Sequence, residues 1–222
     1  MREGARRAKI CPVQGTSFAM LPFKPLFTPI EVAILADAPK RAVEKAMEEK
    51  ALAPRVGKIV AAWMDERNPA RRLLGLEAVV YLVIVRCLAA DVALTIASKR
   101  RLVAELRNRD PGKLGEARVE IAPGVVIDVH KLAGAAIGRA IRYARARDAW
   151  IECVPGRVGG RPTIKGTRIP VHSVAAHVEA GERVEDIAAD NPDIPAEAFE
   201  VAIAFARAHP LPGRPAERRK AA

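Results

Sequence analysis

The spacing of apolar and polar residues along the chain predicts a mainly α-helical protein interrupted by short β-hairpins. The segment Thr-Pro-Ile-Glu at 28–31 is typical of a helix start, with Thr as the N-cap, Pro in the first turn and Glu three residues after the cap. The helix that begins there is expected to end at about Ala36. After a short turn at 37–38, a second helix is expected over 39–50.

The rest of the chain continues this alternation of helices and turns. Weak alternation around Pro123 and Gly124 predicts a β-hairpin, or wing, over 118–129. Ser98 is expected to cap a helix over 99–107. Further helices are predicted over 74–88, 132–147, 171–179, 184–190 and 196–208. The long apolar helix 74–88 is expected in the core or in a dimer interface.

The first two predicted helices have the pattern of a helix-turn-helix. Two short helices joined by a tight turn need small or aliphatic residues along the seam that they share. The chain supplies Val32, Ala33, Ala36, Ala38, Val43, Ala46 and Met47. Asp37 stands where a Gly is usual, and Asp tolerates a left-handed backbone better than most residues. On these residues the unit resembles the start of a MerR-like winged helix.

In a helix-turn-helix the second helix enters the major groove of DNA. Arg41 and Lys45 on that helix are therefore our candidates for groove contacts, and Lys40 and Arg55 are our candidates for phosphate contacts. The alternative is an ordinary helical hairpin whose charged face is only solvated.

The most specific string in the chain is Gly-Gly-Arg-Pro-Thr-Ile-Lys-Gly-Thr-Arg-Ile-Pro-Val at 159–171. It predicts a tight hairpin in which 163–164 pair with 167–169 across a turn where Gly166 supplies the positive φ. The residues expected to build this structural hairpin are Gly160, Arg161, Pro162, Lys165, Gly166, Thr167, Arg168 and Pro170. The spacing of a phosphate-binding P-loop is absent.

Together with Gly181, Ile187 and Asn191-Pro192, this string resembles the family catalogued as domain of unknown function 433, over about 151–215. Members of that family resemble VapB-type antitoxins. The resemblance implies a three-helix, helix-turn-helix-like domain and a role in a type II toxin–antitoxin system. The partner that it implies is a PIN-domain ribonuclease toxin.

The charge of the chain is unevenly distributed. The formal net charge is +11, and residues 1–150 alone hold 27 basic against 16 acidic residues. Residues 151–209 hold 6 basic against 9 acidic residues, and 210–222 hold 4 against 1. Acidic residues work against binding to phosphates, so we assign double-stranded operator DNA to the N-terminal part and protein contact to the C-terminal part.

The basic C-terminal tail is a candidate for toxin binding. A PIN-type nuclease site is a cluster of carboxylates around a divalent metal, and an extended basic segment could pair an Arg with such a carboxylate. The candidate residues are Arg214, Arg218 and Arg219. A solvated tail without a partner and a tail that binds nucleic acid are the alternatives.

Several classes of function find no support in the residues. The three Cys and four His show no metal-ligand spacing, and no arrangement of nucleophile and base is recognisable, so we expect no enzyme, no cofactor and no metal site. The longest uncharged run in the most apolar stretch, 78–85, is too short to span a membrane, and a cytoplasmic location is expected. Met1 and Met20 are both possible starts of translation.

These observations predict four segments and one leading function. The segments are a basic tail at 1–22, a winged-helix-like DNA-binding and helical region at 23–150, an antitoxin-like helix-turn-helix domain at 151–209 and a flexible basic tail at 210–222. The leading hypothesis is an antitoxin that neutralises a PIN-domain ribonuclease and binds operator DNA as a homodimer to regulate its own gene. The alternatives are a stand-alone winged-helix regulator and an adaptor that binds protein only.

Overall fold

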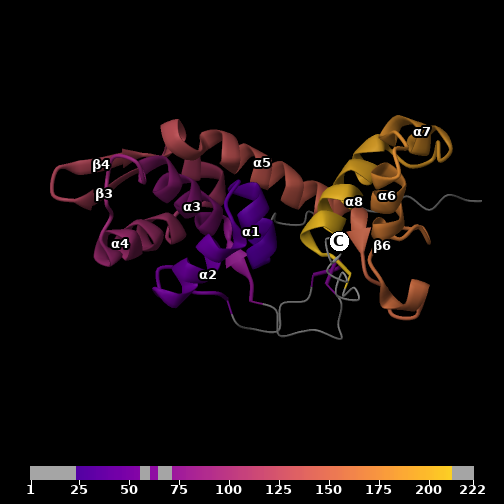
Figure 1. The fold of residues 1–222 in the computed structure, drawn as a ribbon, viewed down its shortest axis with the longest axis horizontal. Coiled ribbons are helices and arrows are strands. Elements are labelled where there is room, and N and C mark those ends of the chain that lie inside the picture. The colour runs from indigo at the N-terminus through magenta and orange to yellow at the C-terminus, as the bar shows by residue number, and fades with distance from the viewer. Residues whose placement is uncertain (1–23, 56–60, 65–71, 212–222) are drawn as a thin grey trace, which may run out of the picture.

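The computed structural model describes residues 24–55, 61–64 and 72–211, and these form helices joined by short antiparallel hairpins, as predicted (Figure 1). The predicted basic tail at 1–22 lies outside the described residues. In chain order the elements are β1 (Leu26–Phe27), α1 (Pro29–Leu35), α2 (Lys40–Glu48), β2 (Leu74–Gly75), α3 (Leu76–Leu88), α4 (Ile96–Arg107), the 3₁₀ turn η1 (Pro111–Glu116), β3 (Arg118–Ala122), β4 (Val125–Asp128), α5 (Val129–Trp150), β5 (Ile151–Glu152), the turn η2 (Arg157–Gly160), β6 (Thr163–Ile164), α6 (Val171–Glu179), α7 (Val184–Ala189) and α8 (Ala196–Ala208).

The predicted helix pair near the N-terminus is confirmed. The Thr28 hydroxyl accepts from the backbone N–H of Glu31, and the Glu31 carboxylate accepts from the backbone N–H of Thr28 at 2.7 Å, which completes a capping box at the start of α1. Asp37 has φ +49°, the left-handed conformation expected at the turn. Of the predicted seam residues, Val32, Ala33, Ala36, Val43 and Ala46 are buried, and Ala38 and Met47 are partly buried.

Helix α3 is the buried centre of the N-terminal unit, which we define as β1 to α5. Eight of its residues are buried, and it packs against α4 and along α5. The predicted helix over 74–88 therefore lies in the core, although 74–75 form β2 against β1. The predicted cap at Ser98 is wrong. The Thr95 hydroxyl accepts from the backbone N–H of Ser98 instead, so α4 begins at Ile96.

The predicted wing forms between α4 and α5. Strands β3 and β4 pair antiparallel around Gly124. The φ of Gly124 is +75°, a conformation that residues with a side chain rarely adopt. Helix α5 starts directly after β4, capped by the Asp128 carboxylate, and continues for 22 residues to Trp150. It is longer at both ends than the helix predicted over 132–147.

The C-terminal unit, β5 to α8, matches the predicted helices closely, and the predicted hairpin in part. The bounds of α6 and α8 are those expected, and α7 ends one residue early. The turn at Gly166 is present with φ +77°, and the Ile164 N–H donates to Ile169 O at 3.0 Å. The strand that pairs with β6 is β5, however, which the sequence did not predict.

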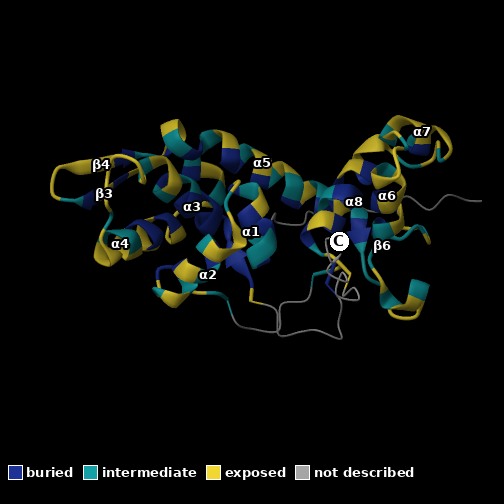
Figure 2. Ribbon diagram, in the orientation of Figure 1, coloured by how far each residue is buried: buried dark blue, intermediate teal, exposed yellow. Residues whose placement is uncertain are grey.

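Two hydrophobic clusters lie along α5: the first reaches from its start to Ala144, and the second packs against its C-terminal end (Figures 1 and 2). The first is built from α1 to α5, and the second from β5, β6 and the three C-terminal helices. The second cluster also takes in Trp63, Met64 and Leu73, which come from the first half of the chain. Helix α5 contacts both α3 and α8 and so connects the two units, and α1 also contacts α8.

A buried polar cluster joins α1 to α5 and to the end of α8. The Glu31 carboxylate accepts from the Tyr143 hydroxyl at 2.7 Å and from Arg147 Nη1 at 2.9 Å, and His209 Nε2 lies 3.3 Å from the same oxygen. The Arg147 guanidinium is 1% exposed and lies 4.0 Å from the ring centroid of Trp63. We call these five residues the Glu31 cluster.

The charged form of Glu31 is stabilised within this cluster. Burial alone would raise the pKa of Glu31, but the contacts with His209 and Arg147 outweigh it and hold that pKa at about 2. The pKa of Tyr143 is raised well above its usual value, first by burial and then by the neighbouring Glu31 carboxylate. Glu31 is therefore an anion at neutral pH, and it compensates the buried charge of Arg147.

We expect Glu31→Gln to lower the free energy of unfolding by about 3 kcal/mol, because it removes the buried carboxylate partner of Arg147 and leaves only the partly exposed Asp148 carboxylate at 2.9 Å, while the shape of the side chain is kept. Urea denaturation of the full chain measures this. The matched control is Glu48→Gln, which neutralises an exposed carboxylate of α2 and should change the value by less than about 0.5 kcal/mol. Equal losses in the two variants would show that the buried Glu31–Arg147 pair stabilises the fold no more than the exposed Glu48 carboxylate does.

The same pair of proteins tests the pH dependence. Because folding lowers the pKa of Glu31 from 4.5 to about 2, its contribution to stability is complete above about pH 4.5 and is lost as the pH falls towards about 2. The difference in free energy of unfolding between the wild type and Glu31→Gln should therefore shrink over that interval. A difference that stays constant down to about pH 2.5 would contradict the lowered pKa.

Candidate functional site

The predicted DNA-contact residues of α2 lie together on one exposed face, but acidic neighbours lie beside each of them. Lys40, Arg41 and Lys45 have side chains that are 61%, 73% and 70% exposed. Lys40 Nζ lies 3.5 Å from Glu44, and Arg41 Nη1 lies 3.1 Å from Glu48. Lys45 Nζ lies 4.0 Å from Glu49. The positive charge of this face is therefore partly compensated before any ligand arrives.

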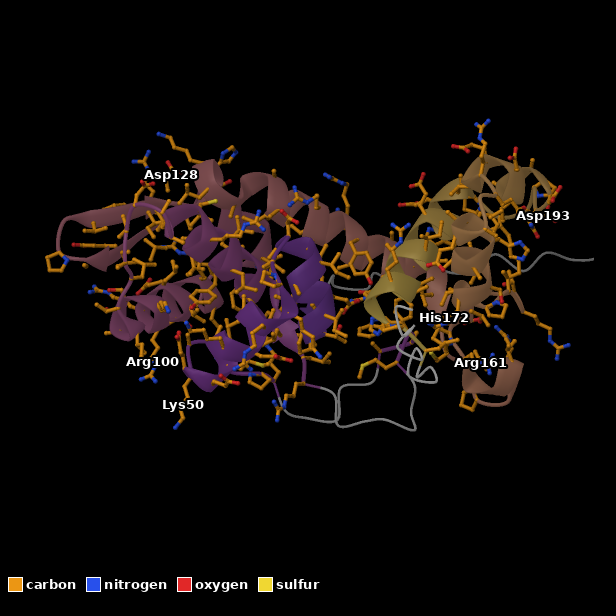
Figure 3. All side chains as sticks on the ribbon, viewed as in Figure 1. Lys50, Arg100, Asp128, Arg161, His172 and Asp193 are labelled. Carbon is orange, nitrogen blue, oxygen red and sulfur yellow. The ribbon has the colours of Figure 1, made fainter. Side chains whose placement is uncertain are left out.

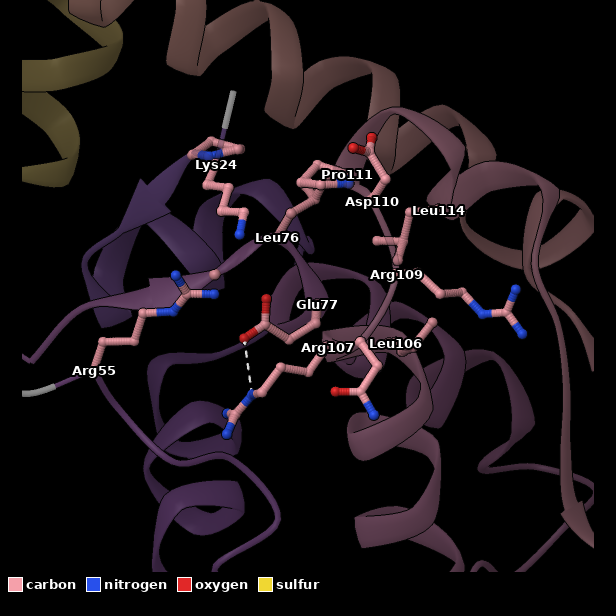
Figure 4. Close-up of a pocket in the computed structure, with 13 residues that line it drawn as sticks. Lys24, Arg55, Leu76, Glu77, Leu106, Arg107, Arg109, Asp110, Pro111 and Leu114 are labelled. Atoms are coloured by element: carbon pink, nitrogen blue, oxygen red, sulfur yellow. Dashed lines mark ion pairs between the residues drawn. The ribbon is translucent and has the colours of Figure 1, made fainter. Parts of the chain in front are cut away.

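Arg55, the fourth predicted residue, lies elsewhere. Its backbone N–H donates to Leu73 O at 2.7 Å, and its side chain lines a pocket of about 280 Å³ that contains no residue of α2. Figure 4 shows the Lys24, Arg55 and Arg107 side chains around the Glu77 carboxylate, with Arg107 paired to Glu77 at 3.4 Å. The structure thus does not place Arg55 with Lys40, Arg41 and Lys45.

A second cationic surface, on α4, escaped the sequence analysis. Arg100 and Arg101 are exposed, and among the described residues no carboxylate lies within 4 Å of either guanidinium. Arg100 Nη2 donates to the Glu49 carbonyl at the end of α2 at 2.8 Å, and Lys99 Nζ pairs with the Glu49 carboxylate at 2.9 Å. These contacts join the C-terminal end of α2 to the first turns of α4. Lys50 and Arg100 project from the same side of the molecule (Figure 3).

The residues of the 159–171 string serve mainly to build the loop before α6. The Glu152 carboxylate accepts from the Gly166 N–H at 3.0 Å and from Arg157. The Thr167 hydroxyl donates to Ile164 O at 2.8 Å and accepts from the Ile169 N–H. Pro170 is the N-cap of α6, and Gly160 ends η2 with φ +75°. The side chains of Arg161, Lys165 and Arg168 stay exposed, whereas Pro162 is half-buried.

A cleft of about 870 Å³ opens between the two units, and we call it the interunit cleft. Its walls come from the start of α1 and α2, from η2 and from the end of α8. The lining residues are Thr28, Pro29, Ile30, Lys40, Trp63, Arg72, Val158, Gly159, Gly160, Arg161, Pro162, His172, Phe205, Ala208, His209, Pro210 and Leu211. Arg161 and His172 lie on the same lower side of the C-terminal unit in Figure 3.

The predicted toxin-contact residues Arg214, Arg218 and Arg219 lie outside the described residues. Within the described ranges, no group of three or more His, Cys, Asp or Glu side chains is placed to hold a metal ion. None of the helices in those ranges combines the length and the apolar character needed to cross a membrane.

We expect Gly166→Ala to lower the free energy of unfolding by about 1 kcal/mol, because an L-residue is disfavoured at φ +77° even though no atom would contact the added Cβ. The matched control is Gly115→Ala, where the space is equally open and φ is not positive. It should have an effect of less than about 0.5 kcal/mol in the same thermal or urea denaturation. If both variants unfold alike, the turn does not need its glycine.

A family model matches the C-terminal unit. Residues 151–206, from β5 into α8, match the family described as "Protein of unknown function (DUF433)". The chain is also 38% identical over 90 residues to "Uncharacterized protein y4eO" of Sinorhizobium fredii (strain NBRC 101917 / NGR234). That alignment covers 40% of this chain and 40% of the relative's length. No solved structure matches the chain. The resemblance of the C-terminal unit to the DUF433 family is thus confirmed over 151–206.

Proposed function

We propose that the chain is the antitoxin of a type II toxin–antitoxin system. It neutralises a PIN-domain ribonuclease toxin through its C-terminal unit and basic tail, and it binds double-stranded operator DNA through its N-terminal unit as a homodimer. The observation that carries the proposal is that the chain folds into two units with separate cores and opposite surface charge. The resemblance to VapB-type antitoxins, read on the 159–171 string, supplies the class of partner.

The N-terminal unit supports the DNA-binding half of the proposal. Helices α1 and α2 form a tight pair, and β3–β4 forms a hairpin beside α4, which is the arrangement expected of a winged-helix-like unit. Each phosphate that a Lys or Arg neutralises releases counterions, so cations without an acidic neighbour contribute most to this binding. By that criterion Arg100 and Arg101 contribute more than Arg41 and Lys45, and the DNA surface extends from α2 onto α4.

The C-terminal unit supports the protein-binding half. The exposed carboxylates of its last two helices and of the loop between them form an acidic surface. They are Glu185, Asp186, Asp190, Asp193, Glu197 and Glu200. A DNA backbone that approached this surface would meet repulsion, whereas a protein partner with basic residues would be attracted to it. We therefore assign protein contact, and not DNA binding, to this helix-turn-helix-like unit.

The homodimer is the part of the proposal that concerns DNA affinity. One helix pair with a short neighbouring helix buries too little surface for tight, specific binding, and two copies on paired half-sites double it. The exposed valines at the tip of the wing, Val125 and Val126, leave an apolar patch that a second copy could cover.

The test separates the two surfaces with two double variants and one truncation. We expect Arg100→Ala with Arg101→Ala to weaken binding to DNA from the upstream region about tenfold or more and to reduce its salt dependence, measured by fluorescence anisotropy at two salt concentrations. Arg41→Ala with Lys45→Ala should weaken it less, because Glu44, Glu48 and Glu49 already compensate that face. Both should leave neutralisation of the nuclease intact.

Removal of 212–222 should weaken neutralisation of the nuclease and leave DNA binding intact, because it deletes the basic tail and leaves every described residue in place. Nuclease inhibition should fall while DNA affinity changes by less than about threefold. Loss of DNA binding in the truncated chain would contradict this division of labour. If no neighbouring gene encodes a nuclease that the chain binds, the stand-alone regulator is favoured, and if DNA binding is absent as well, the protein-only adaptor is favoured.

A further inference from the structure

The interunit cleft has the size and position of a binding site. Its volume of about 870 Å³ lies within the range of ligand-binding pockets, and such pockets are frequent where two folded units meet. Gly159, Gly160, Arg161 and Pro162, the first residues of the most specific string in the sequence, line it. The hairpin explains the later residues of that string, but it leaves the cation of Arg161 without an ion pair among the described residues.

The charged residues that line the cleft are all basic, although Lys40 also pairs with Glu44, outside the lining, at 3.5 Å. Lys40, Arg72 and Arg161 line it with exposed side chains, and no Asp or Glu occurs among the described residues that line it. Each of the three comes from a different segment: Lys40 begins α2, Arg72 precedes β2 and Arg161 follows η2. Cations brought together from distant parts of the chain favour an anionic ligand.

The floor of the cleft is apolar. Trp63, Ile30, Phe205 and Pro162 line it, and Leu211 at its rim is 46% exposed. The outward groups of a DNA backbone are charged, hydrated phosphates, which are poorly suited to cover such a floor, whereas a polypeptide carries both apolar and acidic side chains. The lining therefore favours a protein segment over a nucleic acid.

The chain's own tail has the wrong charge to occupy the cleft. The described chain ends at Leu211 on its rim, and the remaining residues 212–222 carry Arg214, Arg218, Arg219 and Lys220 against Glu217. A basic tail at the rim of a basic cleft adds to the attraction for an acidic partner and is itself repelled.

We propose that the interunit cleft docks an acidic segment of the partner nuclease, with its carboxylates on Arg161, Arg72 and Lys40 and its apolar residues on the floor of the cleft. This inference rests on the proposed function, since the partner is the one assigned there. It adds that the nuclease contacts both units of the antitoxin, including the first residue of α2.

The experiment measures the affinity of the full-length chain for the PIN-domain nuclease encoded beside its gene, by isothermal titration calorimetry. Arg161→Glu and Leu211→Asp should each weaken binding about tenfold or more. The matched controls are Arg168→Glu, an exposed cation of the same string outside the cleft, and Ile34→Asp, at an exposed apolar residue of α1 that does not line the cleft. Each control should change the affinity by less than about threefold.

Each other outcome has a definite meaning. Equal effects of Arg161→Glu and Arg168→Glu would show that the affinity depends on net charge and not on contacts in the cleft, and would overturn the docking site. Loss of DNA binding with nuclease binding retained in Arg161→Glu would make the cleft a nucleic-acid site. Loss of self-association in that variant, seen by sedimentation, would make a second copy of the chain the occupant. If the wild type binds no nuclease, the proposed function itself fails, whereas binding that no cleft variant weakens overturns this inference alone.

Discussion

The whole arrangement depends on one buried carboxylate. Glu31 closes the capping box of α1 through one oxygen, and through the other it contacts Tyr143, Arg147 and His209. The residue that caps the start of a seven-residue helix is thereby also the point at which α5 and the end of α8 contact that helix. Buried ion pairs add little net stability compared with apolar residues of the same shape, but they are costly to break. The contacts of Glu31 with Tyr143, Arg147 and His209 join α1 to α5 and to the end of α8.

The sequence predicted the local features of the fold because their causes are local. Pro39, Gly124, Gly166 and Pro170 mark turns and caps by their own backbone chemistry, and apolar periodicity sets the bounds of α6 to α8 to within a residue. The capping box was found for the same reason. The partners of Glu31 were not, because they lie more than 100 residues away and no periodic pattern encodes such a pairing. The pairing of β5 with β6 escaped because two-residue strands leave no alternation to detect.

The candidate sites also combine features that the sequence shows with contacts that only the tertiary fold creates. The cations on α2 were visible in the sequence, but their compensation by Glu44, Glu48 and Glu49 depends on side-chain distances. The Lys-Arg-Arg run at 99–101 is equally visible in the sequence, but nothing local to it indicates the contact between α4 and the end of α2 that positions it. The interunit cleft could not be predicted at all, since its cations come from three segments that only the tertiary fold brings together.

The C-terminal unit depends on residues from outside its own segment, because the second hydrophobic cluster includes side chains from earlier in the chain. The segment that matches a family, 151–206, supplies most of that cluster, but Trp63, Met64 and Leu73 complete it from far earlier in the chain, and Tyr143, Ala146 and Trp150 of α5 pack against it. A fragment cut at the start of β5 would expose those contacts to water. The unit is therefore no transplantable module, and fusion or excision would have to carry α5 and the 61–73 segment with it.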